Sequence, residues 1–432
     1  MPWRRARKPV ERPINVSRSV EESLEEIARG DEDDDTVEVA DVDGASITEA
    51  ATGEPEDDRT PSELGAKLSA ALVSGSAGAP PKPSTRGAVP PFVGRDATAR
   101  GPSVAKPADP STFAEFGVDL EVDAARGLRL RNPVLTASGT FGQGVEYAEL
   151  FDVARLGAIV NKGTTRDPRL GNPQYRIAET PSGILNSIGL ENPGAAAVAR
   201  TYGPRWEKLG CPVIVNVAGY SVDDYVAVVR EMDGTPGVVA YELNVSCPNV
   251  AGGMLIGCDP LLAAEVVRAV KAETALPVIV KLTPSAPDVV AVALACEEAG
   301  ADALTAINTI LGMRIDTRKR RPILGMGSGG LSGPAIRPIA VHITYQVARA
   351  VSIPIIGAGG VTSAEDALEF LMAGASAVQV GTATFADPLA PVKVLEGLAA
   401  YVREHGLASI RDIIGAALPA ESSDADEESE PH

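Results

Sequence analysis

Apolar and polar positions follow a regular order from residue 118 onward. Eight short runs rich in Val, Ile and Leu alternate with longer amphipathic stretches such as 259–274 and 363–375. The short runs predict buried strands, and the amphipathic stretches predict helices. The predicted strands lie at 133–140, 158–164, 212–219, 238–248, 277–284, 303–310, 353–360 and 377–384, and a predicted hairpin at 118–122 and 128–132 precedes them.

The order of these elements predicts the fold. Near-continuous apolar strands that alternate with helices require a parallel sheet covered by helices. Eight such units in about 300 residues fit a single (β/α)8 TIM barrel, and a doubly wound sheet is the main alternative. The barrel is favoured because polar or glycine residues stand where nearly every strand ends, which is where barrel active sites form. These residues are Ser138, Lys162, Asn216, Asn244, Lys281, Asn308, Gly359 with Gly360, and Gly381 with Thr382.

Both ends of the chain depart from this pattern. Residues 1–112 are rich in acidic residues, Pro, Gly, Ala and Ser, and residues 419–432 form a short acidic tail. Such sequence has too little apolar surface to offset the entropy of ordering, so both segments are predicted to be disordered around a barrel domain at 113–418. For the long extension, a spacer, a docking arm for a partner and a translation start near Val118 that omits it remain alternatives.

The formal net charge of −19 lies mostly in these ends. Residues 1–110 carry 21 acidic and 14 basic side chains, and residues 421–432 carry six acidic and no basic ones. A field of this sign repels nucleic acid, so no nucleic-acid partner is expected.

The composition also restricts location and metal chemistry. No run approaches the roughly 18 apolar residues of a membrane span, and no apolar segment follows the basic N-terminus, so we expect a soluble, cytoplasmic protein without membrane contact. The four cysteines lack C-x-x-C spacing, and the three histidines lie in the last quarter of the chain. A disulfide framework, a cysteine-ligated cluster and a metal site are therefore not expected.

Two glycine-rich turns follow the last two predicted strands. The sequences GAGGVTSAED at 357–366 and VGTATFADP at 380–388 are typical of the phosphate-binding loops of a barrel. The backbone N–H groups there, with the start of the next helix, favour an anion. The residues concerned are Gly359, Gly360, Gly381 and Thr382. Taken singly, such turns are often only helix caps.

Two lysines stand inside apolar strands. Lys162 in VNKGT and Lys281 in VKLTP must reach a polar cavity or an acidic partner, because an isolated buried charge costs several kcal/mol. A structural ion pair is the alternative to a role in holding the anionic or electron-rich part of a cofactor.

Five carboxamides and one thiol complete the candidate chemistry. The carboxamides end predicted strands or lie in loops, where each could be a turn residue; together they would suit a flat, polar heterocycle. They are Asn186, Asn216, Asn244, Asn249 and Asn308. Cys247 could be a small buried apolar residue, but its place between Asn244 and Asn249 favours a reactive thiol. The other cysteines, Cys211, Cys258 and Cys296, are interpreted as structural.

At this level of detail the chain resembles a known family, the dihydroorotate dehydrogenases, and most closely the soluble class 1 enzymes. The resemblance covers about Val118–Ala417. It is carried by TASGTFG from Thr136, NKGTTRDPRLGNPQYRIAET from Asn161, GILNSIGLENPG from Gly183, ELNVSCPNV from Glu242, INTILG from Ile307 and GGLSGPAI from Gly329, together with the two glycine-rich turns.

The resemblance implies FMN as the cofactor. Its phosphate would bind at the two glycine-rich turns, and its ring edge and ribityl chain would lie near the strand ends. The implied cofactor-binding residues are Ser138, Lys162, Asn216, Lys281, Ile307, Gly333, Gly359, Gly360, Gly381 and Thr382.

The resemblance also implies the reaction, the oxidation of (S)-dihydroorotate to orotate in pyrimidine (UMP) biosynthesis. Cys247 would remove the C5 proton as general base while C6 transfers a hydride to N5 of the flavin. The implied substrate-binding residues are Lys162, Asn186, Gly189, Leu190, Asn244, Asn249, Asn308 and Thr309.

Within class 1, the segment VAGGMLIGCDP after Cys247 is more similar to class 1B, although Ile256 replaces a frequent aromatic residue and the long N-terminal extension is not a family feature. Class 1B implies a separate subunit with FAD and an iron–sulfur cluster that passes electrons to NAD⁺, in a heterotetramer or, without it, a homodimer. A dihydropyrimidine dehydrogenase-like FMN barrel and a non-catalytic scaffold barrel with an acidic interaction arm remain alternatives. A tRNA dihydrouridine synthase would require a basic surface.

Overall fold

The computed structural model describes residues 115–245 and 253–419. The predicted terminal extensions lie outside these ranges apart from Pro419, so their disorder and the predicted domain bounds stay predictions.

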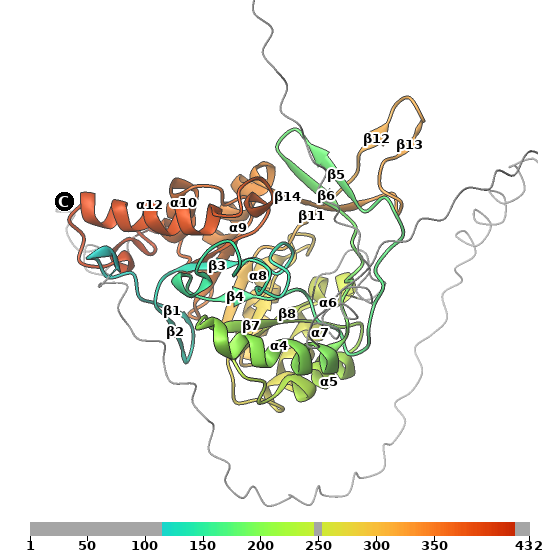
Figure 1. Ribbon diagram of the computed structural model, residues 1–432, viewed down its shortest axis with the longest axis horizontal. Coiled ribbons are helices and arrows are strands. Elements are labelled where there is room, and N and C mark those ends of the chain that lie inside the picture. The colour runs from blue at the N-terminus through green and yellow to red at the C-terminus, as the bar shows by residue number, and fades with distance from the viewer. Residues whose placement is uncertain (1–114, 246–252, 420–432) are drawn as a thin grey trace, which may run out of the picture. The chain divides into compact units, whose positions relative to one another are not determined.

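Eight parallel strands close into a barrel (Figure 1). Each strand pairs with the next along the chain, and the last pairs with the first. The sheet closes between the first two strands through a parallel bridge from Leu135 to Ala158. The predicted TIM barrel is confirmed. Its strands are β3 (Val134–Thr136), β4 (Ile159–Val160), β7 (Val213–Ala218), β8 (Val238–Asn244), β9 (Val278–Lys281), β10 (Ala303–Ala306), β15 (Ile355–Ala358) and β16 (Ala377–Val380).

Burial on both faces explains why these strands read as continuous apolar runs. Every residue of β7, β9, β10, β15 and β16 is buried. One face of each strand fills the barrel interior and the other packs against the helices, so neither face favours polar residues.

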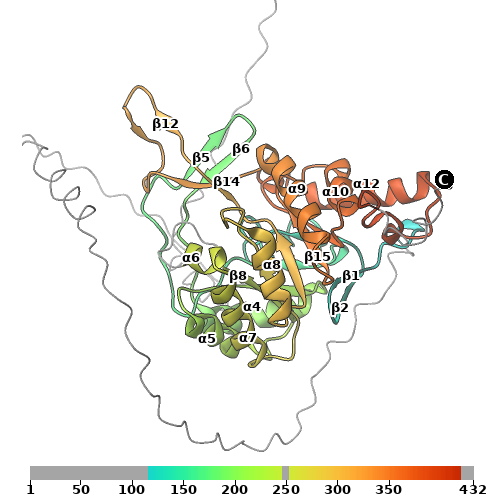
Figure 2. The ribbon, with the colours of Figure 1, turned by 180° about the vertical axis from the view of Figure 1, so that it is seen from behind.

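An outer layer of helices covers the barrel (Figures 1 and 2). The α-helices are α4 (Ala195–Leu209), α5 (Val222–Met232), α6 (Gly253–Cys258), α7 (Pro260–Lys271), α8 (Val289–Glu298), α9 (Arg337–Ala348), α10 (Ala364–Met372), α11 (Ala383–Ala386) and α12 (Ala390–Glu404), and short 3-10 turns are η1 (Val153–Arg155), η2 (Pro334–Ile336) and η3 (Ile410–Ile413). In the described part of the chain, no helix has the length and apolar character needed to cross a membrane.

The first strand lacks the helix that a regular (β/α)8 pattern predicts. Between β3 and β4 the chain forms turns and η1 only. Gly142 and Gly144 adopt left-handed backbone angles, with φ of +56° and +85°, which interrupt a helix. The C-terminal helix α12 packs against β3 instead.

A second, antiparallel sheet was not predicted from the sequence. It contains β11 (Ile310–Gly312), β14 (Gly329–Ser332), β6 (Gly183–Asn186) and β5 (Ile177–Thr180), hydrogen-bonded in that order. A small hairpin of β12 (Ile315–Asp316) and β13 (Arg321–Pro322) follows β11 and projects from this sheet (Figure 1). The loops after β4 and β10 supply all six strands, so the sheet lies at the carboxyl ends of the barrel strands.

The predicted N-terminal hairpin is present but shifted. Its strands are β1 (Val122–Ala125) and β2 (Leu128–Leu130), so the first begins four residues later than the apolar pattern indicated. The preceding residues are used elsewhere: Asp119 forms a bridge with Ser409, and its carbonyl accepts the N–H of Ile410 at 2.9 Å. This contact fastens the two ends of the described chain together.

Candidate active site

A cavity of about 1130 Å³ opens where the barrel strands end, and the antiparallel sheet contributes to its wall. The structure brings to this cavity every predicted site residue that it describes. These residues are Ser138, Lys162, Asn186, Gly189, Leu190, Asn216, Asn244, Lys281, Ile307, Asn308, Thr309, Gly333, Gly359, Gly360, Gly381 and Thr382. Cys247 and Asn249 lie outside the described residues, so their positions and roles stay predictions.

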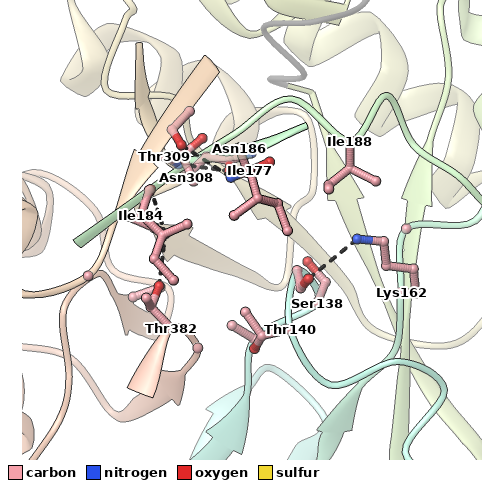
Figure 3. A pocket seen from close by; sticks show the side chains of 18 of the residues that line it. Ser138, Thr140, Lys162, Ile177, Ile184, Asn186, Ile188, Asn308, Thr309 and Thr382 are labelled. Atoms are coloured by element: carbon pink, nitrogen blue, oxygen red, sulfur yellow. Dashed lines mark hydrogen bonds between the residues drawn. The ribbon is translucent and has the colours of Figure 1, made fainter. Parts of the chain in front are cut away.

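Three carboxamides lie on one side of the cavity. Asn308 donates through Nδ2 to Oδ1 of Asn244 at 3.1 Å, and its own Oδ1 accepts the N–H of Thr309 at 2.8 Å. Asn186 donates through Nδ2 to the carbonyl of Gly330 at 3.2 Å, which joins β6 to β14 (Figure 3). These bonds fix the amide planes before any ligand binds, which lowers the entropy cost of binding.

Lys162 lies on the opposite side of the cavity, beside Ser138 and Thr140 (Figure 3). Its Nζ donates to the carbonyl of Gly139 at 3.3 Å. An ammonium has three donors, so this lysine could contact an anionic or carbonyl group in the cavity as well.

Lys281 both reaches the polar cavity and forms an ion pair, which were the two alternatives for a lysine in an apolar strand. It lines the cavity, and its Nζ lies 3.7 Å from Oε1 of the fully buried Glu242 and 2.8 Å from Oε1 of Gln379. The ion pair that was the structural alternative is therefore present. It stands directly below a cavity that the same ammonium lines.

Two glycines of the cavity stand where a side chain would collide with backbone. Gly360 has φ of +80°, and a Cβ there would lie 2.8 Å from the carbonyl oxygen of Gly333. Gly333 itself has φ of +97°, and a Cβ there would lie 2.8 Å from Cα of Gly183. Only glycine fits such positions without displacing the neighbouring chain.

The same loops offer unused backbone donors. In the described ranges, no backbone hydrogen bond uses the N–H groups of Gly360, Gly381 or Thr382. The first turn of α10 is different, because Ser363 and Asp366 cap it with a reciprocal capping box. The loop N–H groups, more than the start of α10, are thus available to hold an anion.

Several residues of the site were not predicted from the sequence. The loop Gln174–Ile177 and the side chains of Ile184, Ile188 and Gln379 also line the cavity. Gln379 and the underlying Glu242 carried a usable signal, since each is a polar residue inside an apolar strand, as Lys281 is. The loop at 174–177 and Ile184 gave no comparable signal, because their place depends on the pairing of β5 with β6 and of β6 with β14.

A barrel whose strand ends form a cavity with glycine-rich turns, unused backbone N–H groups and fixed amides is typical of an α/β-barrel enzyme that binds a phosphate-bearing cofactor. The family model for dihydroorotate dehydrogenase matches residues 120–402. The chain belongs to the dihydroorotate dehydrogenase family, a family of flavin-dependent oxidoreductases.

Relatives are similar over about two thirds of the chain. The chain is 53% identical over 291 residues to the dihydroorotate dehydrogenase B (NAD⁺) catalytic subunit of Desulforamulus reducens, covering 67% of this chain and 96% of the relative. The subunits of the same name from Geotalea uraniireducens and Geobacillus kaustophilus are 50% and 53% identical, over 69% and 67% of this chain and 98% and 93% of their own lengths. The resemblance to class 1B is confirmed.

Proposed function

We propose that this chain is the FMN-dependent catalytic subunit of a class 1B dihydroorotate dehydrogenase, which oxidises (S)-dihydroorotate to orotate in pyrimidine (UMP) biosynthesis. The single observation that supports this proposal best is the cavity, which gathers a glycine-lined anion site, two lysines and fixed amides at the carboxyl ends of the barrel strands.

The residues present fit FMN. Oδ1 of Asn216 is buried and has no hydrogen-bond partner among the described residues, so it requires a ligand donor, which the N3–H of a flavin would provide. The unused N–H groups of Gly360, Gly381 and Thr382 suit a phosphate. We infer that Ser138, Lys162, Lys281, Ile307, Gly333 and Gly359 complete this site. Bound FMN would supply the acceptor for the hydride that leaves C6 of the substrate.

The remaining polar side chains suit a flat pyrimidine with a carboxylate. Fixed amides of Asn186, Asn244 and Asn308 present donors and acceptors from one wall, and the Lys162 ammonium offers a positive charge from the other. We infer that Gly189, Leu190, Asn249 and Thr309 also contact the substrate. These groups hold the ring in one orientation, which is the proximity contribution to the rate.

We assign the proton transfer to Cys247, which follows the cavity residue Asn244 by three positions. The thiolate takes the C5 proton as the hydride leaves C6, and the product is orotate. An ordinary thiol has a pKa near 8.5, so the base form becomes more abundant on the alkaline side of neutrality.

Anaerobic mixing of the flavin-loaded protein with dihydroorotate tests this function, with loss of oxidised flavin absorbance as the signal. The parent protein should be reduced within seconds, and dihydrouracil should be inert. Reduction by dihydrouracil but not dihydroorotate would favour the dihydropyrimidine dehydrogenase-like alternative, and a colourless protein that cannot be reconstituted with FMN would exclude a flavin enzyme.

Cys247→Ala should retain flavin but lose roughly 10²-fold or more in the rate of its reduction, which is typical of removing a general base. Cys247→Ser should recover partly at high pH. Cys258→Ala is the matched control: this half-buried thiol donates to the carbonyl of Ser285 at 3.6 Å, does not line the cavity and should leave the rate unchanged. Normal reduction of Cys247→Ala would remove Cys247 from the role of base.

We further propose that electrons leave through a separate subunit that carries FAD and an iron–sulfur cluster and reduces NAD⁺, in a cytoplasmic heterotetramer. The names of the relatives, which describe a catalytic subunit and NAD⁺, support a second subunit. The purified chain should therefore reduce NAD⁺ only when the partner is added, and NAD⁺ reduction by the chain alone would refute this arrangement.

A further inference from the structure

A buried carboxylate lies directly beneath the cavity. Glu242 belongs to β8, has no exposed surface and does not itself line the cavity. Side chains from four other strands contact it. Its Oε1 accepts Nδ2 of Asn216 at 2.7 Å and lies 3.7 Å from Nζ of Lys281, and its Oε2 accepts Nε2 of Gln379 at 2.5 Å and the hydroxyl of Thr305 at 2.8 Å.

This polar cluster, defined by Asn216, Glu242, Lys281, Thr305 and Gln379, occupies a position where barrels usually hold branched apolar side chains. Each of its members is at most 5% exposed. A buried ion pair seldom stabilises a fold more than apolar packing of the same volume. A gain in fold stability therefore does not explain why polar residues occupy this position.

Glu242 determines which way the two neighbouring amides point. An ionised carboxylate only accepts hydrogen bonds, so Asn216 and Gln379 must turn their NH₂ groups toward it. A flipped amide would place two acceptor oxygens against each other. The side-chain oxygen of Gln379, Oε1, then faces Lys281 at 2.8 Å from Nζ. The side-chain oxygen of Asn216, Oδ1, is left without a partner in the described part of the chain.

The outcome is an ordered pair of groups at the bottom of the cavity. Asn216 holds an acceptor that is unpaired among the described residues, its buried Oδ1, and Lys281 holds an ammonium with three donors, of which one is directed to Oε1 of Gln379 at 2.8 Å while Glu242 balances its charge from 3.7 Å. Oε1 of Glu242 accepts the hydrogen bond from Asn216 and forms the ion pair with Lys281. An acceptor beside a donor matches the imide edge of a flavin, where N3–H stands next to a carbonyl.

We propose that Glu242 is a positioning residue for the flavin, which fixes Asn216 as an acceptor and neutralises Lys281 from below the cavity. The inference rests on the proposed function. Glu242 acts through these two side chains and touches neither cofactor nor substrate. Its negative charge also opposes the build-up of negative charge on the bound ring.

The decisive variant is Glu242→Gln, which keeps the size of the side chain and removes its charge. A carboxamide cannot replace a carboxylate that accepts from Asn216, Gln379 and Thr305 together, so at least one neighbour must reorient, and Lys281 is no longer neutralised. Three properties of the holoenzyme should change together: FMN affinity should fall roughly tenfold, the flavin midpoint potential should become more positive, and the pKa of flavin N3–H should fall.

Asp302→Asn is the matched control. Asp302 also holds a lysine, with Oδ2 at 2.7 Å from Nζ of Lys271, but it precedes β10 at the amino end of the barrel. This variant should lose stability without any change in flavin potential or N3–H pKa. An effect limited to stability in both variants would overturn the proposal, because a merely structural role predicts that result.

A second pair of variants covers the case in which Glu242→Gln does not fold because Lys281 is left unpaired. Lys281→Met is compared with the double variant Lys281→Met, Glu242→Gln, which removes both charges. Release of the Asn216 amide should lower the N3–H pKa further in the double variant, and equal values would overturn the proposal. If the parent chain binds FMN and dihydroorotate reduces it, either contrary result refutes the role of Glu242 alone. A parent chain that binds no FMN refutes both proposals.

Discussion

At the residue scale, neighbouring atoms leave no space for a side chain at Gly360, which lines the cavity. A Cβ on this residue would meet the carbonyl of Gly333 and Cβ of Arg337, each at 2.8 Å, and φ of +80° disfavours any other residue type. Arg337 in turn forms an ion pair with the buried Asp366. The anion site is thus built against groups that have little freedom to move.

Gly360→Ala should therefore destabilise the fold by about 2–4 kcal/mol and reduce the FMN content of the purified protein. The free-energy cost of placing alanine in a left-handed backbone conformation adds to the cost of the steric collision of its Cβ. Gly234→Ala is the matched control. Gly234 has φ of +73°, but a Cβ on this residue would meet no atom within 4 Å, so only about 1 kcal/mol should be lost. Urea denaturation and flavin absorbance measure both effects, and equal losses in the two variants would contradict the steric argument.

Two buried thiols give the fold a predictable response to alkaline pH. Burial raises the pKa of Cys211 to about 12 and that of Cys296 to about 12, well above the pKa of an ordinary thiol. Between pH 9 and pH 12 the unfolded chain therefore releases protons that the folded chain retains, and the free energy of unfolding falls as pH rises through this window.

The double variant Cys211→Ala, Cys296→Ala should lose less stability than the parent between pH 8 and pH 10, by roughly 1 kcal/mol for each thiol. Urea denaturation with a reducing agent at the two pH values measures the difference. Parallel losses in parent and variant would show that these thiols do not titrate in the window.

At the element scale, elements that local sequence determines were predicted from the sequence, and elements that depend on pairing between distant segments were not. All eight barrel strands were predicted, because burial on both faces leaves an apolar run that is visible locally. The helix expected after β3 is absent, since Gly142 and Gly144 turn the backbone. The antiparallel sheet was missed because β6 and β14, which meet at Asn186 and Gly330, lie 144 residues apart in the chain.

The candidate site shows the same division. Residues that end barrel strands, such as Asn216 and Lys281, must converge once the barrel is predicted, and the structure brings them to one cavity. The loop Gln174–Ile177 could not be predicted in this way. Its place depends on long-range pairs such as the N–H of Gly325 with the carbonyl of Tyr175.

The antiparallel sheet has a small core of its own, formed by Ala178, Leu185 and Leu324. A sheet of short strands over so few apolar side chains should open more readily than the barrel. Leu324→Ala should therefore speed amide exchange in β5, β6 and β14 while the global unfolding midpoint changes little.

Hydrogen exchange with mass spectrometry and thermal unfolding distinguish the two effects. Leu395→Ala is the control, because Leu395 lies fully buried in α12 within the main core and its truncation should cost about 2–5 kcal/mol of global stability. A large fall in the global midpoint for Leu324→Ala would show that the antiparallel sheet unfolds together with the barrel.

At the scale of the whole molecule, the described residues begin at Glu115 and contain the barrel core, the cavity and every predicted site residue except Cys247 and Asn249. Glu115 pairs with Arg155 at 2.6 Å, and Arg403 donates to the carbonyl of Phe116 at 2.7 Å. Side-chain contacts thus hold the described chain against the barrel from Glu115 onward.

Removal of residues 1–112 should leave FMN content and flavin reduction unchanged and shift the thermal midpoint by no more than about 2 °C. A chain that starts at Val118 also loses the contacts of Glu115 and Phe116, and it should melt a few degrees lower. Lost flavin in the first truncation would show that the extension is part of the site.

The bridge between Asp119 and Ser409 has a topological consequence. The adjacent hairpin bonds at the amino end of the barrel, where the N–H of Arg126 donates to the carbonyl of Asp302 just before β10, so the chain enters and leaves on the side away from the cavity. The two ends of the barrel domain are therefore neighbours in space, as they would be if a circular chain were opened at this one position. Sequence can be added at that position, or the opening can be moved by circular permutation, without obstructing the entrance to the cavity.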